Sequence, residues 1–527
     1  MKMLNEDNWR LRDDNWYFVA LFIVCLALHL NFSFVGWGNT ICDVHCFRQT
    51  QTAISTYYLI KEGFKINYIT PVLGKPWAIP MEFPLYQWIV AAFAIITKIN
   101  LDQAGRFISL SFFYFSLIPL YYLLSLFIAK RAHILVFLCL VLASPVYIFW
   151  SRTFMIESLA LFLNLTFLVA VVKTANKPGP NKMLIASVVG ILAALSKITT
   201  FVVFCLPAAL LFAWFSLRQN RQNAFSLRTL SRQAASACLL FGVPIILNIA
   251  WIIFADRQKS LNPMAADFIT SGALKIWHFG RLSQRLSADV WDRVLSYGSV
   301  GTYETFVANF LISYGLLLLL AHKYRKQALW CFLFFIFGPL VLINLFWEHN
   351  YYSYASGLFF LLSLGFCIVS LLENDKWKVL TQVLILPLII LFLHRTYFLD
   401  FYPVQKRNNL SLQSLSRAVK AYTKENDVIL IYGFDWSSAL PYYSQRRALM
   451  DKWGLPFAER KFQLVLKQLG KDRITAMVIA GNKRSDGSFI EQRVKNLNLL
   501  PNPAYRDWFV DLYISADAGN RRDNKSH

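Results

Sequence analysis

Recurrent apolar runs, each about as long as a bilayer core is thick, constrain this chain more than any other feature. Runs of roughly 17 to 23 residues recur along the sequence, and about 20 apolar residues are needed for a helix to cross a membrane. Of the 527 residues, 56% are hydrophobic and only 16% are charged, whereas soluble domains carry about 25% charged residues. The sequence therefore predicts a polytopic α-helical membrane protein.

The apolar runs predict about eleven membrane spans, with about twelve or thirteen as the alternative. The expected spans are residues 16–36, 106–128, 133–150, 155–173, 183–197, 199–216, 236–254, 306–322, 328–347, 356–372 and 378–398. The first run is long for a signal sequence and has no small-residue cleavage site behind it, so we expect it to be retained.

A further apolar run, 83–99, is short and begins beside a proline, and the basic loops decide how it is read. Lys and Arg are enriched in cytoplasmic loops. The basic stretches 130–131, 173–182, 218–232 and 323–326 all become cytoplasmic only if 83–99 does not cross the bilayer. We therefore expect an interfacial or re-entrant helix there, a cytoplasmic N-terminus and an outer C-terminus.

The composition changes near residue 403 and predicts two domains. We expect a transmembrane domain over 1–402, with outer loops 37–105 and 255–305, and a small extracytoplasmic α/β domain over 403–527. In the latter, "DVILIYG" and "TAMVIAG" are typical of buried strands. The net charge of +23 fits basic cytoplasmic loops, and we expect no nucleic-acid partner because no RNA-binding module or basic-aromatic groove is visible.

Most of the eight cysteines lie inside apolar runs, where they are expected to pack as small apolar residues. Only Cys42 and Cys46 lie in a polar segment. The chain has no CxxC pair and no disulfide-scaffold pattern, so we expect these two cysteines to remain unbridged.

The predicted topology places many ionisable side chains at or near one membrane face, as an active site requires. They are Asp43, His45, Arg48, Glu82, Arg152, Glu157, Lys197, His278 and His349. Ordinary structural explanations stay open: a solvated helix around Asp43, helix capping by Glu82, and an ion pair between Arg152 and Glu157.

Lys197 interrupts an apolar run, where its charge can meet a lipid phosphate, either of a bulk headgroup or of a substrate. His278, Arg281 and Arg285 are spaced i, i+3 and i+7, which predicts one helical face. Such a face can bind metal or phosphate, or can lie on lipid headgroups. Tyr351 is typical of the aromatic belt of a membrane protein.

The order of the motifs resembles the GT-C glycosyltransferases, nearest to the branch of aminoarabinose transferases and protein O-mannosyltransferases. The motifs are "DVHCFRQ", "MEFP", "RTFMIES", "LSKIT" and "WHFGR", and the resemblance extends over roughly residues 10–400. It implies transfer of a hexose or pentose from a polyprenyl-phosphate donor to a hydroxyl of a lipid, glycan or protein. It also implies a location in the bacterial inner (plasma) membrane, with the reaction at the outer face.

The resemblance also implies residue roles. Asp43 takes the position of the general base and Arg48 that of a donor-phosphate contact. Glu82 takes the position of a metal ligand, although Phe83 replaces the lysine that often follows it. The remaining implied substrate contacts are Arg152, Glu157, Lys197, Arg281 and Tyr351. Lys197 is followed by Ile198 where glycine is usual.

A divalent metal ion is the only cofactor that the resemblance implies. His278 is the implied second ligand beside Glu82, with His45 and His349 as alternatives. The set is incomplete, so a water-filled site without metal stays open.

Two other functions remain open from the sequence: a flippase or transporter of lipid-linked sugars, and a polymerase or ligase of surface polysaccharide. Transporters tend to carry internal repeats and spans broken near mid-membrane. No convincing repeat is visible in this sequence, which favours the transferase.

Overall fold

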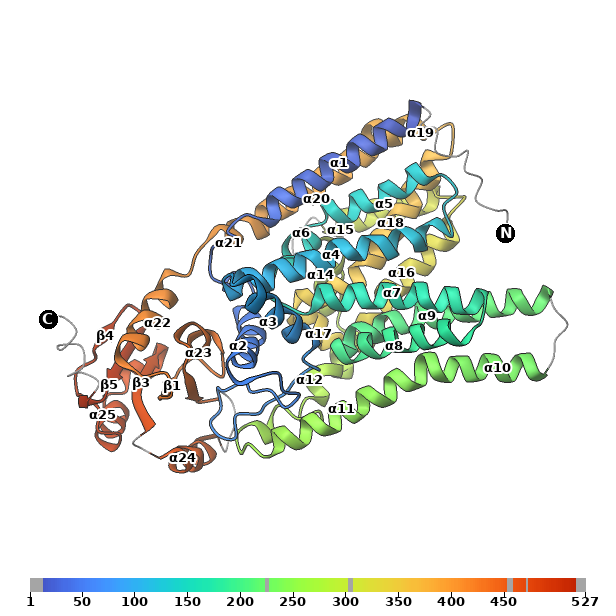
Figure 1. Cartoon of the computed structure of the whole chain (residues 1–527). Helices are drawn as coiled ribbons and strands as arrows, with labels where there is room; N and C mark the ends of the chain where they lie inside the picture. Colours follow the sequence, from blue (N-terminus) through green and yellow to red (C-terminus); the bar gives the residue numbers. More distant parts are fainter. Residues whose placement is uncertain (1–12, 223–226, 302–306, 453–457, 471–472, 518–527) are drawn as a thin grey trace. The chain divides into compact units, whose positions relative to one another are not determined.

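The computed structural model describes residues 13–222, 227–301, 307–452, 458–470 and 473–517. The chain divides into two compact units, which are described separately (Figure 1). Unit 1 comprises Met1–Trp37, Ser109–Asn248 and Ile276–Lys406. Unit 2 comprises Gly38–Ile108, Ile249–Lys275 and Arg407–His527.

Unit 1 is a bundle of apolar helices. Its long helices are α1 (Asp13–Ser33), most of α4 (Leu101–Ser125), α5 (Arg131–Ala143), α7 (Glu157–Asn176), α8 (Pro180–Ser196), α9 (Ile198–Gln222), α15 (Val307–Leu320), α16 (Arg325–Val341), α18 (Ser353–Leu372) and α20 (Leu386–Thr396). Helix α1 packs beside α5, α7 beside α8 and α9, and α16 beside α18 (Figure 1). Among the long apolar helices, α18 is the most completely buried.

Each expected span coincides with a helix or a run of helices, which confirms the predicted fold class. In the described part of the chain, seven helical stretches are long and apolar enough to cross a membrane. Other expected spans are short or interrupted. The span expected at 133–150, for example, is split into α5 and α6 (Pro145–Trp150). The split occurs because Ser144, which precedes a proline, is extended with ψ 128°.

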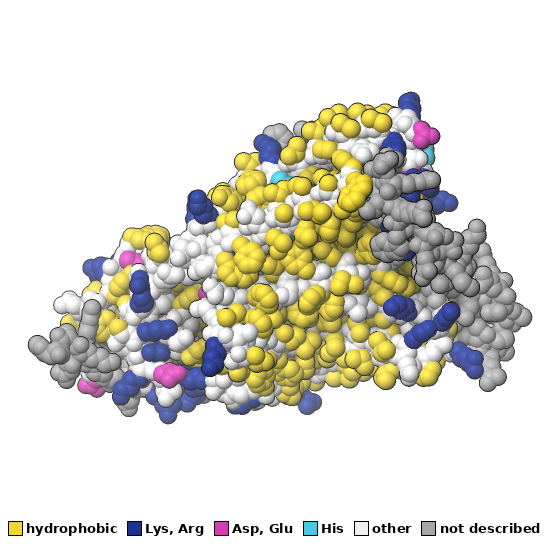
Figure 2. All heavy atoms as spheres, turned by 45° about the horizontal axis from the view of Figure 1, so that its top comes forward, with side chains coloured by type: hydrophobic (Ala, Val, Ile, Leu, Met, Phe, Trp, Pro, Cys, Tyr) yellow, Lys and Arg dark blue, Asp and Glu magenta, His cyan; other side chains and the backbone are white. Residues whose placement is uncertain are grey.

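The surface of the helices agrees with a lipid environment. On the face drawn in Figure 2, hydrophobic side chains cover the helices, and most Lys and Arg side chains lie outside this area. Ile118, Ile246 and Leu319 are each well exposed on helices of unit 1. Large exposed apolar areas of this kind mark membrane or protein contacts.

Unit 2 contains the α/β part of the chain. Its five-stranded sheet has the order β2-β1-β3-β5-β4, formed by β1 (Val428–Tyr432), β2 (Arg447–Met450), β3 (Ile474–Ala480), β4 (Tyr505–Arg506) and β5 (Val510–Ile514). Strands β1, β2 and β3 are parallel, whereas β5 is antiparallel to β3. Strand β1 is buried throughout, as the apolar run "VILIY" predicts for a parallel strand covered on both faces.

The first outer loop also belongs to unit 2. It contains α2 (Cys46–Glu62) and α3 (Leu85–Thr97). Between these helices, the carbonyls of Pro71 and Val72 accept hydrogen bonds from the N–H groups of Ala448 and Met450 at 2.9 and 3.0 Å. These bonds cover the free edge of β2, which would otherwise expose unpaired backbone groups. The domain boundary at 402/403 remains a prediction.

Candidate functional site

The segment before α2 turns sharply. His45 lies in the left-handed region, with φ 47° and ψ 47°, and α2 begins at Cys46. This turn brings the Cα atoms of Cys42 and Cys46 to 4.1 Å, and a disulfide joins the two residues. The expectation that they remain unbridged is wrong, because spacing alone does not reveal the left-handed turn that closes the loop around Asp43.

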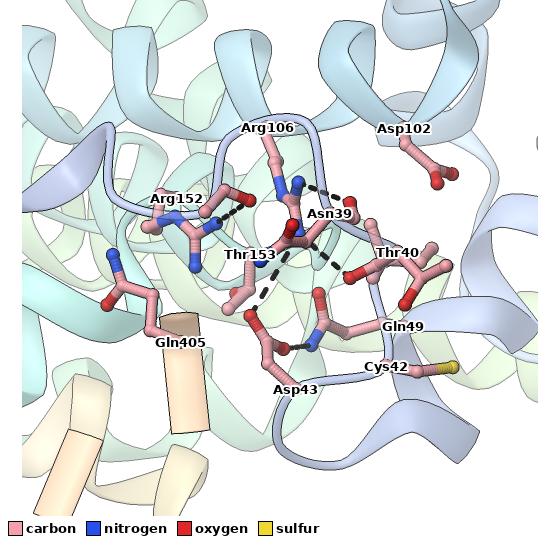
Figure 3. Close-up of polar contacts among 12 residues, drawn as sticks. Asn39, Thr40, Cys42, Asp43, Gln49, Asp102, Arg106, Arg152, Thr153 and Gln405 are labelled. Carbon is pink, nitrogen blue, oxygen red and sulfur yellow. Dashed lines mark hydrogen bonds and ion pairs between the residues drawn. The ribbon is translucent and has the colours of Figure 1, made fainter. Parts of the chain in front are cut away.

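The side chain of Asp43 is buried, with 3% of it exposed. Its Oδ1 accepts hydrogen bonds from the N–H of Val44 at 2.9 Å and from Nε2 of Gln49 at 2.7 Å. Its Oδ2 lies 4.0 Å from the guanidinium of Arg106, whose side chain is 1% exposed (Figure 3). The carboxylate therefore has a fixed orientation and a cation beside it.

Arg106 is a site residue that the sequence analysis missed. It lies near the start of α4 and donates to the carbonyls of Asn39 at 2.8 Å and Thr40 at 3.1 Å (Figure 3). It is the first residue of the span expected at 106–128, so the apolar pattern alone does not single it out as a site residue. An arginine at the outer end of a span, where the positive-inside bias predicts few cations, was the available signal.

Asp102, one turn before Arg106, links the same segment to the C-terminal part of unit 2. Its carboxylate accepts hydrogen bonds from the hydroxyls of Tyr442 at 2.5 Å and Tyr443 at 2.8 Å. The Tyr443 hydroxyl in turn accepts from the N–H of Ile41 at 2.7 Å. Burial, and then the charge of Asp102, raise the pKa of Tyr443, so the hydroxyl remains a donor at neutral pH. The two tyrosines lie on α23 (Ala439–Ser444) and were not predicted as site residues.

The structure brings Arg48 and Glu82 together. They form an ion pair, and the other terminal nitrogen of Arg48 donates to Oε1 of Gln51 at 2.7 Å. The Tyr68 hydroxyl donates to the Glu82 carbonyl at 2.9 Å and accepts from the N–H of Met81 at 2.7 Å. Burial, and then the Glu82 charge, raise the pKa of Tyr68, so this hydrogen-bond donor persists at neutral pH.

The donor set around Glu82 does not fit a divalent ion as it stands. The carboxylate is engaged by the cation of Arg48, and divalent ions require several oxygen or nitrogen ligands. Over the ranges that the structure describes, no three His, Cys, Asp or Glu side chains are grouped to hold a metal. Glu82 lies in unit 2 and its implied partner His278 in unit 1. No step below is therefore routed through a metal.

Unit 1 contains a second charged cluster. Lys197 follows the end of α8 and Glu157 begins α7. The two side chains are 5% and 3% exposed and form an ion pair. The Lys197 ammonium also lies 4.5 Å from the ring centre of Tyr352 and 5.3 Å from that of Tyr351. The second oxygen of Glu157, Oε2, is buried and has no hydrogen-bond partner among the residues that the structure describes.

Two further predicted residues lie in unit 1. Arg152 lies in the turn before α7, is fully buried and donates to the Gly36 carbonyl at 3.4 Å (Figure 3). His349 stacks on Tyr351 with ring centres 5.2 Å apart and meets Trp277 edge-on at 5.8 Å. These ring contacts hold the imidazole of His349 in place, and metal binding by His349 stays a prediction.

The single helical face expected for His278, Arg281 and Arg285 is not formed. Gly280, with φ 69°, separates α12 (Lys275–Phe279) from α13 (Leu282–Leu286). Arg281 precedes α13, and its N–H donates to Oε1 of Gln284 at 2.8 Å. Arg285 donates to the carbonyls of Phe279 at 2.6 Å and Val341 at 3.1 Å, and also to that of Leu340. Arg285 therefore caps the end of α16, and the helix breaks because glycine tolerates a positive φ.

Comparison with known proteins shows a likeness in structure. No family model matches the sequence, and no curated protein matches it. ArnT from Cupriavidus metallidurans, solved with undecaprenyl phosphate, aligns over 94% of this chain and 98% of its own, with 10% identity and a TM-score of 0.56. AglB, an archaeal oligosaccharyltransferase from Archaeoglobus fulgidus, was solved with an inhibitory peptide and a dolichol-phosphate. It aligns over 91% of this chain and 71% of its own, with 11% identity and a TM-score of 0.50. At these identities the likeness shows a shared fold.

Proposed function

We propose that this chain, which has the fold of these GT-C membrane proteins, is itself a membrane glycosyltransferase. It moves a sugar from a polyprenyl-phosphate donor to an acceptor hydroxyl. The buried and oriented carboxylate of Asp43 carries this proposal. The ArnT structure of the same fold contains undecaprenyl phosphate, which supports a donor of this lipid class.

The reaction needs a base and a stabilised leaving group. The acceptor hydroxyl attacks the anomeric carbon and loses its proton to Asp43, while the bond between that carbon and the phosphate oxygen breaks. Polyprenyl phosphate leaves with the bonding electrons. Gln49 and Arg106 fix the orientation of the Asp43 carboxyl group, whose oxygen takes up the proton in this step. Attack opposite the leaving phosphate inverts the anomeric centre.

Positive charge must meet the departing phosphate. We assign this role to Arg48, which lies with Asp43 in unit 2. Lys197, in unit 1, remains a proposed substrate contact. Glu157 and the ring of Tyr351 hold the Lys197 ammonium in place, and Arg152 and Arg281 remain proposed substrate contacts. A divalent ion at Glu82 or His278 would add charge for the phosphate, and it would require Arg48 to release Glu82.

We place the reaction at the outer face of the bacterial inner membrane, with the N-terminus in the cytoplasm. The basic stretches between the expected spans support this orientation. The acceptor is a hydroxyl of a lipid, glycan or protein.

Reconstituted protein tests the proposal. Purified protein in vesicles is given a polyprenyl-phosphate sugar and acceptor extracts, and transferred sugar and released polyprenyl phosphate are measured. Asp43→Asn should lower transfer by about 10²–10⁴-fold, the range for a general base. Asp486→Asn is the matched control, because Asp486 is an exposed cap of α25 (Gly487–Asn496), a role that asparagine also fills.

Each alternative has its own outcome. Full activity of Asp43→Asn would remove Asp43 as the base. Sugar movement across the vesicle membrane without release of polyprenyl phosphate would identify a flippase instead. Products that grow by repeated sugar units would identify a polymerase.

A further inference from the structure

A cavity of about 510 Å³ lies within unit 1 and has no part in the proposed reaction. Side chains of α4, α7, α9, α16 and α18 line it, and nearly all of them are apolar. Pockets of about 300–1,000 Å³ hold small molecules in other proteins. The exceptions to the apolar lining are Lys326 and Gln327, at the start of α16.

Helix α9 shows how far the cavity is from the Lys197 cluster. The helix begins at Ile198, next to Lys197, and contributes cavity residues from Pro207 to Leu217. At about 1.5 Å per residue, these lie roughly 15 to 30 Å along the helix from Lys197. Helix α16 leads to the same conclusion. Lys326 lies in its first turn, whereas its last turn leads toward Tyr351, whose ring lies beside the Lys197 ammonium. The cavity is therefore in the opposite half of the bundle from the Lys197 cluster.

The cavity mouth has the chemistry of a membrane interface. Trp214 and Trp330 line it and are 47% and 52% exposed, respectively. Tryptophan is enriched where the bilayer meets water. Lys326 is exposed and forms no ion pair with any residue that the structure describes, whereas neighbouring Lys323 pairs with Glu373. One cationic side chain is thus available beside an apolar cavity.

We propose that this cavity binds an acyl chain of an anionic phospholipid, with the lipid phosphate beside Lys326. An apolar cavity inside a membrane bundle admits a hydrocarbon chain, and a cation at its mouth adds a preference for a negative headgroup. By the bias of the basic loops, the lipid belongs to the cytoplasmic leaflet. The tail of a polyprenyl donor would not account for a cation at this position. The only charged group of the donor is its phosphate, which would lie at the other membrane face. The proposal does not depend on the proposed transferase activity.

Photocrosslinking tests the lipid site. Full-length protein in phosphatidylcholine vesicles receives a phosphatidylglycerol with a photoreactive acyl chain, and the labelled peptides are mapped. We expect labelling of α9 and α16 that unlabelled phosphatidylglycerol displaces and phosphatidylcholine does not. Lys326→Glu should lower this labelling by at least about fivefold, the effect of one basic residue near an anionic headgroup.

Matched variants separate a specific site from general lipid contact. Ala213→Trp fills the cavity and should abolish labelling, whereas Ala209→Trp, on the same helix but outside the cavity lining, should not. Lys376→Glu is the charge control, because Lys376 is exposed at the same end, three residues after Glu373, the partner of Lys323. Thermal unfolding shows whether each variant is folded. If Ala213→Trp does not fold, the labelling of Lys326→Glu tests the proposal by itself, because Lys326 is exposed.

Two results would overturn the proposal. Equal labelling in all variants would mean only bulk lipid contact. In the second result, Ala213→Trp abolishes labelling, Lys326→Glu does not change it, and both lipids compete equally. The cavity would then bind a hydrocarbon chain without regard to headgroup charge, such as the donor tail.

Discussion

At the scale of single residues, Lys197 and Glu157 are the most constrained pair in unit 1. Both are almost fully buried and they pair with each other. A buried charge without its partner is costly, because desolvation is no longer offset by the attraction. This explains why a lysine can occupy a position that interrupts an apolar run.

The first prediction follows from this pairing. Lys197→Met and Glu157→Gln should each destabilise the protein by about 3–5 kcal/mol, the cost of breaking a buried ion pair. The double variant should be less destabilised than the sum of the two, because it leaves no unpaired charge. Denaturant unfolding in detergent measures the three values, and strict additivity would contradict the pairing.

The second prediction concerns Arg48 and Glu82. Because the Arg48 guanidinium occupies the Glu82 carboxylate, we expect a chelator to leave sugar transfer unchanged. Arg48→Lys should lower transfer, since a single ammonium cannot meet both Gln51 and Glu82 as the guanidinium fork does. Transfer assays with and without chelator check both statements. If a chelator abolishes transfer and a divalent ion restores it, Glu82 would instead be supported as a metal ligand.

At the scale of elements, the short helix α23 is tied to the segment that contains Asp43. Tyr443 connects the N–H of Ile41 to the carboxylate of Asp102, and Asn408 accepts from the N–H of Thr40 at 3.2 Å. The C-terminal residues of unit 2 therefore hold the backbone on which the proposed base is mounted.

The third prediction follows from the Tyr443 hydroxyl. Tyr443→Phe should destabilise this contact by about 1–3 kcal/mol, because it leaves the buried N–H of Ile41 unsatisfied. Hydrogen exchange should become faster in residues 38–46, and sugar transfer should fall. Tyr505→Phe is the control, since that hydroxyl bonds only Asp507 in the described contacts. Unchanged exchange in 38–46 would show that Tyr443 does not position the segment.

At the scale of the whole molecule, the number of crossings before α4 determines the sidedness of every later loop. We predict that a cysteine introduced at Leu101, between α3 and the body of α4, reacts with a membrane-impermeant thiol reagent from the outer face. The unmodified protein supplies the background from its own thiols. Reaction from the cytoplasmic face alone would show that α3 crosses the bilayer, and it would reverse the proposed orientation.

The sequence by itself determined the fold class, the positions of the helices and the buried strands β1 and β3. These follow from the apolar runs and their lengths, which are local features of the sequence. Apolar side chains are buried in protein or lipid whatever the rest of the fold is. It also singled out Asp43, Glu157 and Lys197, because an ionisable residue at the edge of an apolar run is costly without a role or a partner.

Only the tertiary structure decided the partners. Glu82 meets Arg48, Asp43 is flanked by Arg106, and Asp102 meets tyrosines about 340 positions along the chain. The turn at His45 that brings Cys42 to Cys46, and the break at Gly280, depend on single backbone angles. The physical reason is that burial is favoured wherever apolar residues recur, whereas a hydrogen bond or ion pair forms only when distant backbone segments bring two atoms within about 3 Å.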